Sequence, residues 1–404
     1  MPTRRTALLT TAAAALALAA PAHAAVNDRA TRALKTHREP GSRRIRLALP
    51  APTGNHPVGT VSLHLVDRAR RDPWLPDRPH RELMVDVRYP ARTVHGHPRA
   101  PQMRRGAADG FAALNNLADV PADRVDWAAT LTHAYERAPL DSGVRSLPVV
   151  LYSPGVLDPR TYGTTTADDL ASRGFLVVMV DHTYDATAVE FPGGRVEHSR
   201  LPDELEGTGG AEEQVRALLR KTLAVRVADL RFVLDALPSA LPPLVRRAGD
   251  LARVGAYGQS AGGFAAMQLM HDDQRVRCAA NLDGVLAHVQ DDKQPGHFSS
   301  VAVDGVDRPY LLLGKEGNSP DTVPSWGALV RNSSGPGRVK EVRGAAHGSF
   351  TDSQVLIPQV ARELGLSADV VEALVGRIAP ERSVAVQQAA LAGLFGRLRT
   401  NGTS

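Results

Sequence analysis

The sequence is poor in cysteine and in aromatic residues. Its 404 residues include one cysteine, and Phe, Trp and Tyr together make up 4%. One thiol cannot form an internal disulfide bond, and no Cys or His cluster has the spacing of a metal site. An apolar core must therefore stabilise the fold, which a chain of this length permits. The cysteine, Cys278, lies in the apolar run 276–282 and is expected to be a small buried side chain.

Long apolar runs are missing except near the N-terminus. Arg4 and Arg5 precede an apolar run at 6–20, and Ala22-His23-Ala24 has the small-x-small pattern of a cleavage site. The run is too short and too rich in alanine for a comfortable membrane span. We therefore expect residues 1–24 to be a signal peptide, read by the Sec or the twin-arginine route, and the mature protein to be secreted.

Excess positive charge is confined to one stretch. The formal net charge is +5, yet residues 25–50 alone hold seven Lys and Arg against two acidic residues. Residues 51–404 have no positive excess and no basic patch interleaved with aromatic residues, so nucleic acid is not an expected partner. Residues 25–50 are predicted to be a solvated basic leader. Transient contact with an anionic cell or lipid surface is the alternative.

The remaining sequence predicts one domain, 51–404, of the α/β class. Two strand-like runs come first, 61–66 and 83–89, and read as an antiparallel edge. From residue 147 onward, short apolar runs alternate with helical patterns. Runs this apolar are typical of a mostly parallel central sheet with helices on both faces. The predicted parallel strands are 147–152, 175–180, 253–257, 276–282 and 310–313.

Two segments fit this alternation less well. Residues 123–135 lie in a polar, irregular region and are predicted to form a helix. Residues 186–210 contain two glycine-rich turns and no clear periodicity. They form either a cap over the active edge of the sheet or a surface insertion, and the sequence favours neither.

Gly258-Gln259-Ser260-Ala261-Gly262 is the one GxSxG pattern in the chain. A strand-like run precedes it and a helical stretch, 261–270, follows it. This strand–turn–helix context predicts a nucleophile elbow, in which the serine hydroxyl stands clear of the sheet on a tight turn. The N-terminus of the following helix stabilises negative charge nearby. Ser260 is therefore the candidate nucleophile.

A serine nucleophile needs a general base, and the base needs an orienting carboxylate. Asp283 ends the strand-like run that follows the nucleophile helix and is the candidate acid. His347 lies in a loop of small residues before a helix and is the candidate base. His182 precedes Ser260 in the chain and is interpreted as structural or pocket-lining. The less favoured acids are Asp291, Asp292 and Asp304, and the less favoured bases are His271, His288 and His297.

The oxyanion of an acyl-transfer intermediate needs two backbone N–H donors. Ala261, directly after the nucleophile, is expected to supply one. Val156, in the loop after the strand 147–152, is expected to supply the other, with Gly155 allowing an unusual backbone conformation there. A simple turn at Pro154-Gly155 is the alternative. Trp326 is interpreted either as lining an acyl pocket or as packing in the core.

Several segments resemble the platelet-activating factor acetylhydrolase family of α/β-hydrolases. The likeness covers roughly 147–350 and follows one order along the chain. This chain has Pro154 where the family often has histidine, so the likeness bears more on fold and triad than on substrate. The similar segments are Leu151-Tyr152-Ser153-Pro154-Gly155, Asp168 to Val178, Val180-Asp181-His182, Gly258 to Gly263, Asn281-Leu282-Asp283-Gly284, and His347 with Phe350-Thr351-Asp352.

The resemblance implies an α/β-hydrolase fold and a secreted serine esterase that cleaves carboxylic, lipid-type esters through an acyl-enzyme. The expected partner is a small-molecule or lipid ester. No cofactor or metal is expected, and the oligomeric state is left open. The alternatives are a broader lipase or polyesterase with the same chemistry, and a non-catalytic binding protein on a hydrolase scaffold.

Overall fold

The computed structural model describes residues 44–400, apart from residues 116, 118, 119, 121, 122, 290 and 294. The predicted signal peptide and residues 25–43 of the predicted leader lie outside the described residues.

The strands are β1 (Val58–Asp67), β2 (Arg81–Pro90), β3 (Arg99–Pro101), β4 (Leu131–Glu136), β5 (Leu147–Ser153), β6 (Leu176–Val180), β7 (Ala188–Glu190), β8 (Val196–His198), β9 (Gly249–Gln259), β10 (Val276–Leu282), β11 (Tyr310–Lys315) and β12 (Gly337–Val342). The α-helices are α3 (Arg105–Ala113), α4 (Thr164–Ser172), α5 (Leu201–Gly207), α6 (Glu212–Ala240), α7 (Pro243–Ala248), α8 (Ala261–Asp272), α9 (Ser300–Asp304), α10 (Pro324–Asn332), α11 (Ser353–Leu364), α12 (Ala368–Val375), α13 (Pro380–Phe395) and α14 (Arg397–Thr400).

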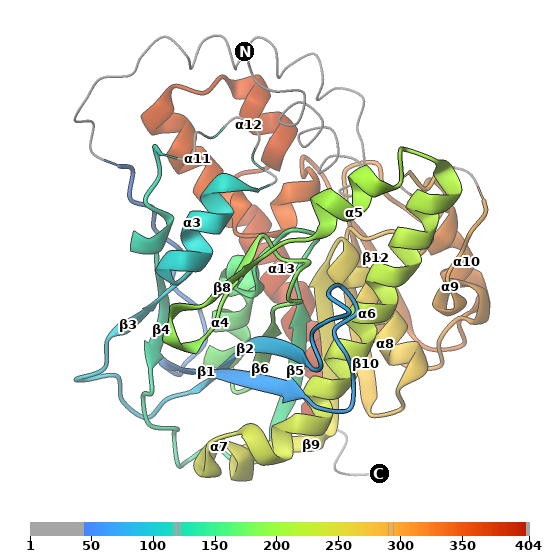
Figure 1. Ribbon diagram of the computed structural model, residues 1–404. Helices are drawn as coiled ribbons and strands as arrows, with labels where there is room; N and C mark the ends of the chain where they lie inside the picture. Colours follow the sequence, from blue (N-terminus) through green and yellow to red (C-terminus); the bar gives the residue numbers. More distant parts are fainter. Residues whose placement is uncertain are drawn as a thin grey trace.

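A ten-stranded sheet forms the centre of the molecule (Figure 1). Its order is β12-β11-β10-β9-β5-β6-β2-β1-β4-β3. All neighbours from β12 to β6 are parallel, whereas β2 runs antiparallel to both β6 and β1. The predicted α/β class, the parallel strands and the antiparallel N-terminal region are therefore confirmed.

Helices cover both faces of the sheet and create two cores. Along β6, Leu176, Val178 and Val180 pack into one apolar cluster with α6 and α8. Val177 and Met179, which point the other way, pack into a second cluster with α4 and α13. Both faces are buried, which explains why these strands read as continuous apolar runs.

The longest helix, α6, carries charged residues on its buried side. Arg216, Arg226 and Asp229 are each at most 9% exposed. Within the described ranges, no helix combines the length and the apolar character that crossing a membrane requires. Of the three buried charges, Arg226 contacts the loop that follows β5, as described below.

The prediction of a helix at 123–135 is wrong. This region forms a short 3₁₀ turn, η1 (Trp127–Ala129), and then strand β4. Thr132 and Ala134 are buried between more exposed neighbours, which is the two-residue period of a strand. Pairing with β1 and β3 therefore overrides the weak local helical preference.

The prediction of a solvated leader at 25–50 is wrong for its last residues. Ile45 forms a bridge with Val125, and Ala48 forms one with Leu131. Leu47 and Leu49 are buried in a third apolar cluster, shared with α3, α11 and α12. Residues 44–49 thus belong to the folded body.

Residues 186–210 form the two-stranded β7–β8 ribbon and helix α5. Leu201 and Leu205 of α5 pack in one apolar cluster with Val156 and Leu157, in the loop after β5. The segment therefore lies beside that loop. A cap over the active edge and a surface insertion both stay predictions for this segment.

Asp352, just before α11, accepts hydrogen bonds from the first residues of helix α4, which lies far away in the sequence. Its Oδ1 accepts from the Thr165 N–H (3.1 Å), and its Oδ2 accepts from the Thr164 N–H (3.1 Å) and from Gln102 Nε2 (2.7 Å). Complete burial raises the pKa of Asp352 from 3.8 to about 7 despite these donors.

We expect Asp352→Asn to flatten the pH dependence of stability. Between pH 3.8 and about 7 the folded carboxyl keeps a proton that the unfolded one loses. The folded state then binds more protons, so this group lowers the free energy of unfolding as pH rises through that window. Urea unfolding at pH 5 and pH 8 should show a larger loss of stability in the wild type than in the variant. Equal losses would contradict the assignment.

Candidate active site

Ser260 occupies a strained turn between β9 and α8. Its backbone has φ 55° and ψ −124°, a conformation that non-glycine residues rarely adopt. The Ser260 N–H donates to Leu282 O (2.9 Å), and the Ser260 carbonyl accepts from the Phe264 N–H (3.0 Å). Strand β10 and the first turn of α8 thus hold the strained residue in place.

The two glycines of the pattern allow backbone segments to touch. A Cβ at position 258 would lie 2.3 Å from the carbonyl carbon of Gly262. A Cβ at position 262 would lie 1.9 Å from Ser153 O and 2.4 Å from Pro154 O. Such distances are far inside van der Waals contact, so the elbow and the loop after β5 require glycine at both positions.

Asp283 and His347 meet at the carboxyl edge of the sheet. His347 begins the 3₁₀ turn η4 (His347–Phe350) after β12, and its Nδ1 donates to Asp283 Oδ2 at 2.6 Å. Asp283 is 1% exposed, and its Oδ1 accepts from the Lys315 N–H (2.9 Å) and Asn318 Nδ2 (2.8 Å). The carboxylate keeps the proton on Nδ1, which leaves Nε2 as a proton acceptor.

The Nε2 atom of His347 faces Gln259. The amide nitrogen of Gln259 lies 3.0 Å from it, as a donor to the lone pair of this nitrogen in the Nδ1–H tautomer. Within the described part of the chain, no hydrogen bond joins the side chains of Ser260 and His347. Contacts between catalytic groups are often loose without substrate and tighten when it binds.

The rival acids and bases lie elsewhere. His271 pairs with Asp272 and Asp304 at the surface. Asp292 is buried and accepts from the Ser325 N–H. Among the described residues, no hydrogen bond joins Ser260 to the other rivals, which are His288, His297 and Asp291.

The loop after β5 carries the expected oxyanion donor. Val156 is 4% exposed and lies on the same cleft as Ser260 and Ala261. The expectation of an unusual backbone at Gly155 is wrong, because the residue with positive φ in this loop is Leu157, at 63°. A Cβ at position 155 would lie 2.5 Å from Gln259 Oε1 and 2.8 Å from Asp158 Oδ2, so the ends of these two side chains would have to move for a larger residue.

The cleft beside Ser260 is narrow and mainly apolar. It encloses about 50 Å³. Its lining includes no residue of 186–210 and does not include Trp326. That tryptophan is fully buried and donates to Gly284 O (2.7 Å), so it packs in the core. The lining residues are Val156, Leu219, Thr222, Leu223, Arg226, Ser260, Ala261, Phe264, Val285, Ala287 and Val289.

A second serine–histidine–aspartate chain lies inside the protein. His182 Nδ1 donates to Asp229 Oδ2 (3.0 Å), and His182 Nε2 accepts from Ser153 Oγ (2.9 Å). All three residues are at most 1% exposed, so a substrate cannot reach them. Burial lowers the pKa of His182, which is therefore neutral. Of the two interpretations of His182, structural or pocket-lining, its burial favours the structural one.

Asp229 is the charged anchor of this chain. Burial alone would raise its pKa, but Arg81, together with the hydrogen bond from His182, holds it well below the ordinary value. Arg81 Nη2 lies 2.8 Å from Asp229 Oδ2, and Arg70 Nη2 lies 2.5 Å from Oδ1.

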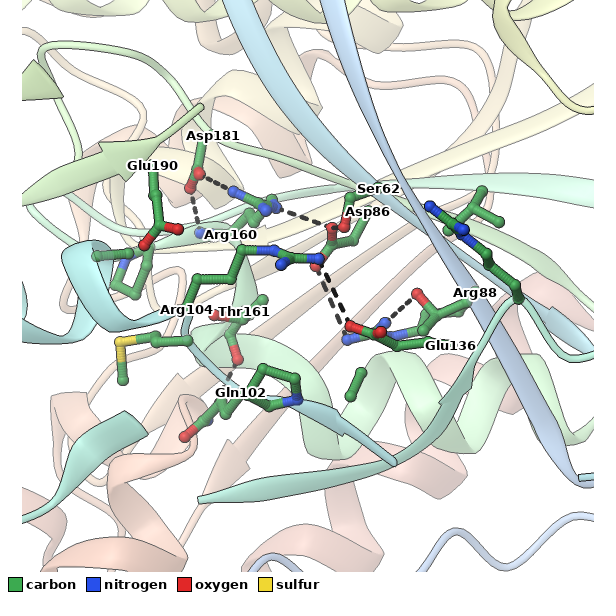
Figure 2. Close-up of a pocket in the computed structure, with 18 residues that line it drawn as sticks. Ser62, Asp86, Arg88, Gln102, Arg104, Glu136, Arg160, Thr161, Asp181 and Glu190 are labelled. Carbon is green, nitrogen blue, oxygen red and sulfur yellow. Dashed lines mark hydrogen bonds and ion pairs between the residues drawn. The ribbon is translucent and has the colours of Figure 1, made fainter. Parts of the chain in front are cut away.

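A polar cavity lies near the C-terminal end of the loop that follows β5 (Figure 2). Arg160 pairs there with Asp86 (3.2 Å) and with Asp181. Burial alone would raise the pKa of Asp86, but Arg160 and Arg88 hold it below its ordinary value. Four arginines and four carboxylates line this cavity, so its charges are balanced. Neither Ser260 nor His347 lines it, and it is therefore separate from the candidate active site.

The described residues do not favour metal or thiol chemistry. Across them, no group of three or more His, Cys, Asp or Glu side chains is placed to hold a metal ion. Cys278 is 1% exposed, and burial raises the pKa of its thiol to about 12. As expected, Cys278 behaves as a small buried side chain.

Known proteins resemble this chain over most of its length. Residues 109–237 match the family model described as "Platelet-activating factor acetylhydrolase, isoform II". A probable 1-alkyl-2-acetylglycerophosphocholine esterase of Arthroderma benhamiae is 26% identical over 355 residues, covering 83% of this chain and 84% of that protein. The solved structure of a ferulic acid esterase from Streptomyces cinnamoneus is 33% identical, with a TM-score of 0.68, over 87% of this chain and 92% of that one.

The chain belongs to the platelet-activating factor acetylhydrolase-like family of α/β-hydrolases. It is a serine-type carboxylic ester hydrolase. The resemblance seen in the sequence is therefore confirmed. The matched span 109–237 contains the loop after β5 and most of α6, and it ends before Ser260.

Three polar side chains near the site of this esterase escaped the sequence analysis. Gln259 and Asn318 carry no sequence signal, because their partners are distant in the chain. Arg226 does carry one, since it follows Leu223 by three residues and precedes Leu230 by four, on the apolar face of α6. A charge at such a position indicates a buried partner.

We expect Gly262→Ala to damage both stability and catalysis of the esterase. The added methyl would meet two carbonyl oxygens of the loop after β5, so backbone must shift. Overpacking of this kind costs about 2–3 kcal/mol. Displacing the loop by about 1 Å should lower kcat/KM roughly 100-fold. Urea unfolding and ester hydrolysis measure the two effects.

Gly393→Ala is the matched control, because nothing lies within 4 Å of a Cβ at this position in α13. It should raise stability by up to about 1 kcal/mol and leave activity unchanged. Wild-type activity in Gly262→Ala would show that the close contact is dispensable.

Proposed function

We propose that the enzyme hydrolyses esters by two-step acyl transfer with Ser260 as the nucleophile. The 2.6 Å hydrogen bond between His347 and the buried Asp283 carries this assignment, because it prepares Nε2 to accept a proton. Ser260 Oγ attacks the ester carbonyl carbon while its proton passes to His347 Nε2. The backbone N–H groups of Val156 and Ala261 stabilise the oxyanion.

Collapse of the tetrahedral intermediate breaks the bond to the leaving alcohol, which takes the proton from His347. A water molecule then attacks the acyl-enzyme, giving its proton to His347, and the acid is released as Ser260 regains its proton. His347 must exchange its contact with Gln259 for one with Ser260 before the first step. We expect this exchange to take place when substrate binds.

The small volume of the cleft favours an ester whose acyl group is short. Its volume of about 50 Å³ is well below the roughly 150 Å³ of an apolar cavity that holds benzene. The Arthroderma relative is named for an acetyl ester of a glycerophosphocholine, which agrees with this size. We therefore favour short acyl esters of phospholipid-like or neutral alcohols. The Streptomyces relative keeps a broader esterase as the second candidate.

Hydrolysis of 4-nitrophenyl acetate, butyrate, octanoate and palmitate, together with methyl ferulate, tests this function. We expect kcat/KM to be highest for acetate or butyrate. Ser260→Ala should lower kcat by at least about 10⁴-fold, because the residual rate comes only from the oxyanion donors and binding. Ser239→Ala, on the exposed side of α6, should retain full activity.

A peak at palmitate would favour a lipase, and preference for methyl ferulate would favour the broader esterase. Folded wild-type protein that cleaves none of these esters would instead support a non-catalytic binding protein.

We also propose that the enzyme is exported. The basic n-region, the apolar run 6–20 and Ala22-His23-Ala24 support a signal peptide. The arginines and lysine of 25–43 fit a solvated basic leader, with transient contact to an anionic lipid surface as the alternative.

Expression of the full-length chain in a bacterial host with both export routes tests this assignment. Protein recovered outside the cytoplasm should begin at Ala25, as read by N-terminal sequencing. Replacing both Ala22 and Ala24 by leucine should block cleavage, and Arg4→Lys with Arg5→Lys should block export only if the twin-arginine route is used. Intact protein that remains in the cytoplasm would contradict the proposal.

A further inference from the structure

Arg226 of α6 grips the loop that carries the proposed oxyanion donor. Its Nη1 donates to Pro154 O (2.5 Å), and its Nη2 donates to Gly155 O (3.0 Å). Asp185 fixes the guanidinium from the other side, accepting from Nε (2.7 Å) and from Nη2 (2.6 Å). Arg226 and Asp185 are each 1% exposed.

The Gly155 carbonyl and the Val156 N–H belong to one peptide unit. That unit is planar and trans, so its C=O and N–H point in opposite directions. Hydrogen bonding of Gly155 O to Arg226 therefore sets the direction of the Val156 N–H, which must point away from the guanidinium. The contact to Pro154 O fixes the preceding peptide plane in the same way.

We propose that Arg226 is a positioning residue that aims the Val156 N–H at the oxyanion. The inference rests on the proposed function, because it concerns the donor assigned there. Arg226 acts through the backbone and not on the substrate, even though it lies on the wall of the cleft.

The hydrogen-bond partners of Arg226 support a role in positioning the loop and not in binding the substrate. A guanidinium has five N–H donors. Asp185 takes two of them and the carbonyls of Pro154 and Gly155 take two more. Ser153 Oγ lies 3.4 Å from Nη1 as the fifth acceptor. No donor of Arg226 is left to bind an anionic group of a substrate.

The hydroxyl of Ser153 connects the end of β5 to the buried Asp229 through His182. The neutral His182 accepts from this hydroxyl and is itself held by Asp229. Two buried carboxylates, Asp185 through Arg226 and Asp229 through His182, thus hold the last residue of β5 and the first two residues of the loop. A rigid donor requires such support, because oxyanion stabilisation depends on N–H groups that need no reorganisation.

Arg226→Lys tests the proposal, because an ammonium cannot bridge a carboxylate and two carbonyls as the planar guanidinium does. We expect kcat for 4-nitrophenyl acetate to fall about 10- to 100-fold, since losing a whole oxyanion donor costs about 10²–10³-fold. KM should stay within about twofold, because the loss falls on the transition state.

The decisive readout is the ratio of kcat/KM for 4-nitrophenyl acetate to that for its thionoacetate analogue. Sulfur accepts hydrogen bonds weakly, so an aimed N–H donor helps the thionoester much less. The ratio should fall about 10-fold in Arg226→Lys, in line with the loss in kcat. Arg88→Lys is the matched control, because Arg88 is equally buried and ion-paired but lies in the polar cavity of Figure 2. It should lose comparable stability and keep the wild-type ratio.

Parallel losses on both esters, or an unchanged ratio in an active Arg226→Lys, would overturn the proposal. Should that variant fail to fold, Asp185→Asn decides, since it loosens Arg226 without removing it and should lower the ratio to a smaller extent. The proposed function fails separately, when Ser260→Ala is as active as the wild type or when the wild type is inactive. In that case the positioning role is overturned as well.

Discussion

The active edge of this esterase depends on one backbone contact. The carbonyl oxygen of Ser153 occupies the space where a side chain at position 262 would begin. This contact joins the end of β5 to the first turn of α8, and so joins the oxyanion loop to the nucleophile elbow. The strained conformation of Ser260 persists because hydrogen bonds to β10 and within α8 surround it.

Buried charge holds the rest of the edge in place. Removing one partner of a buried ion pair generally costs about 3–5 kcal/mol, because the other charge is left without compensation. Asp185 with Arg226, and Asp229 with Arg81, are such pairs, and both connect to the loop after β5. Asp283 accepts from the last residue of β11, from Asn318 in the loop that follows, and from His347. Ser260, the oxyanion loop and His347 are thus each held by hydrogen bonds from neighbouring residues, most of them buried.

The sequence predicted the parts of the fold that have a strong local signal. The buried parallel strands are continuous apolar runs, and their order along the chain placed Asp283 and His347 after Ser260. β12 was missed because five of its six residues are exposed, as suits a strand at the edge of a sheet. β4 was mistaken for a helix because its strand character comes from pairing with β1.

The hydrogen bonds that organise the site lay beyond sequence reasoning for a different reason. Gln259 contacts His347 across 88 positions, and Arg226 contacts Gly155 across 71. Such pairs follow from the way β5, α6 and β9 come together in space. Only the charge of Arg226 on an apolar helix face pointed to a buried partner.

Labelling with a fluorophosphonate most directly tests which serine is the nucleophile. Ser260 and Ser153 both lie near a histidine–aspartate pair, but we expect only Ser260 to act as a nucleophile. Mass spectrometry of the digested, labelled enzyme should place the adduct on the peptide that contains Ser260, with concurrent loss of esterase activity. An adduct on Ser153, or inactivation without modification of Ser260, would contradict the account.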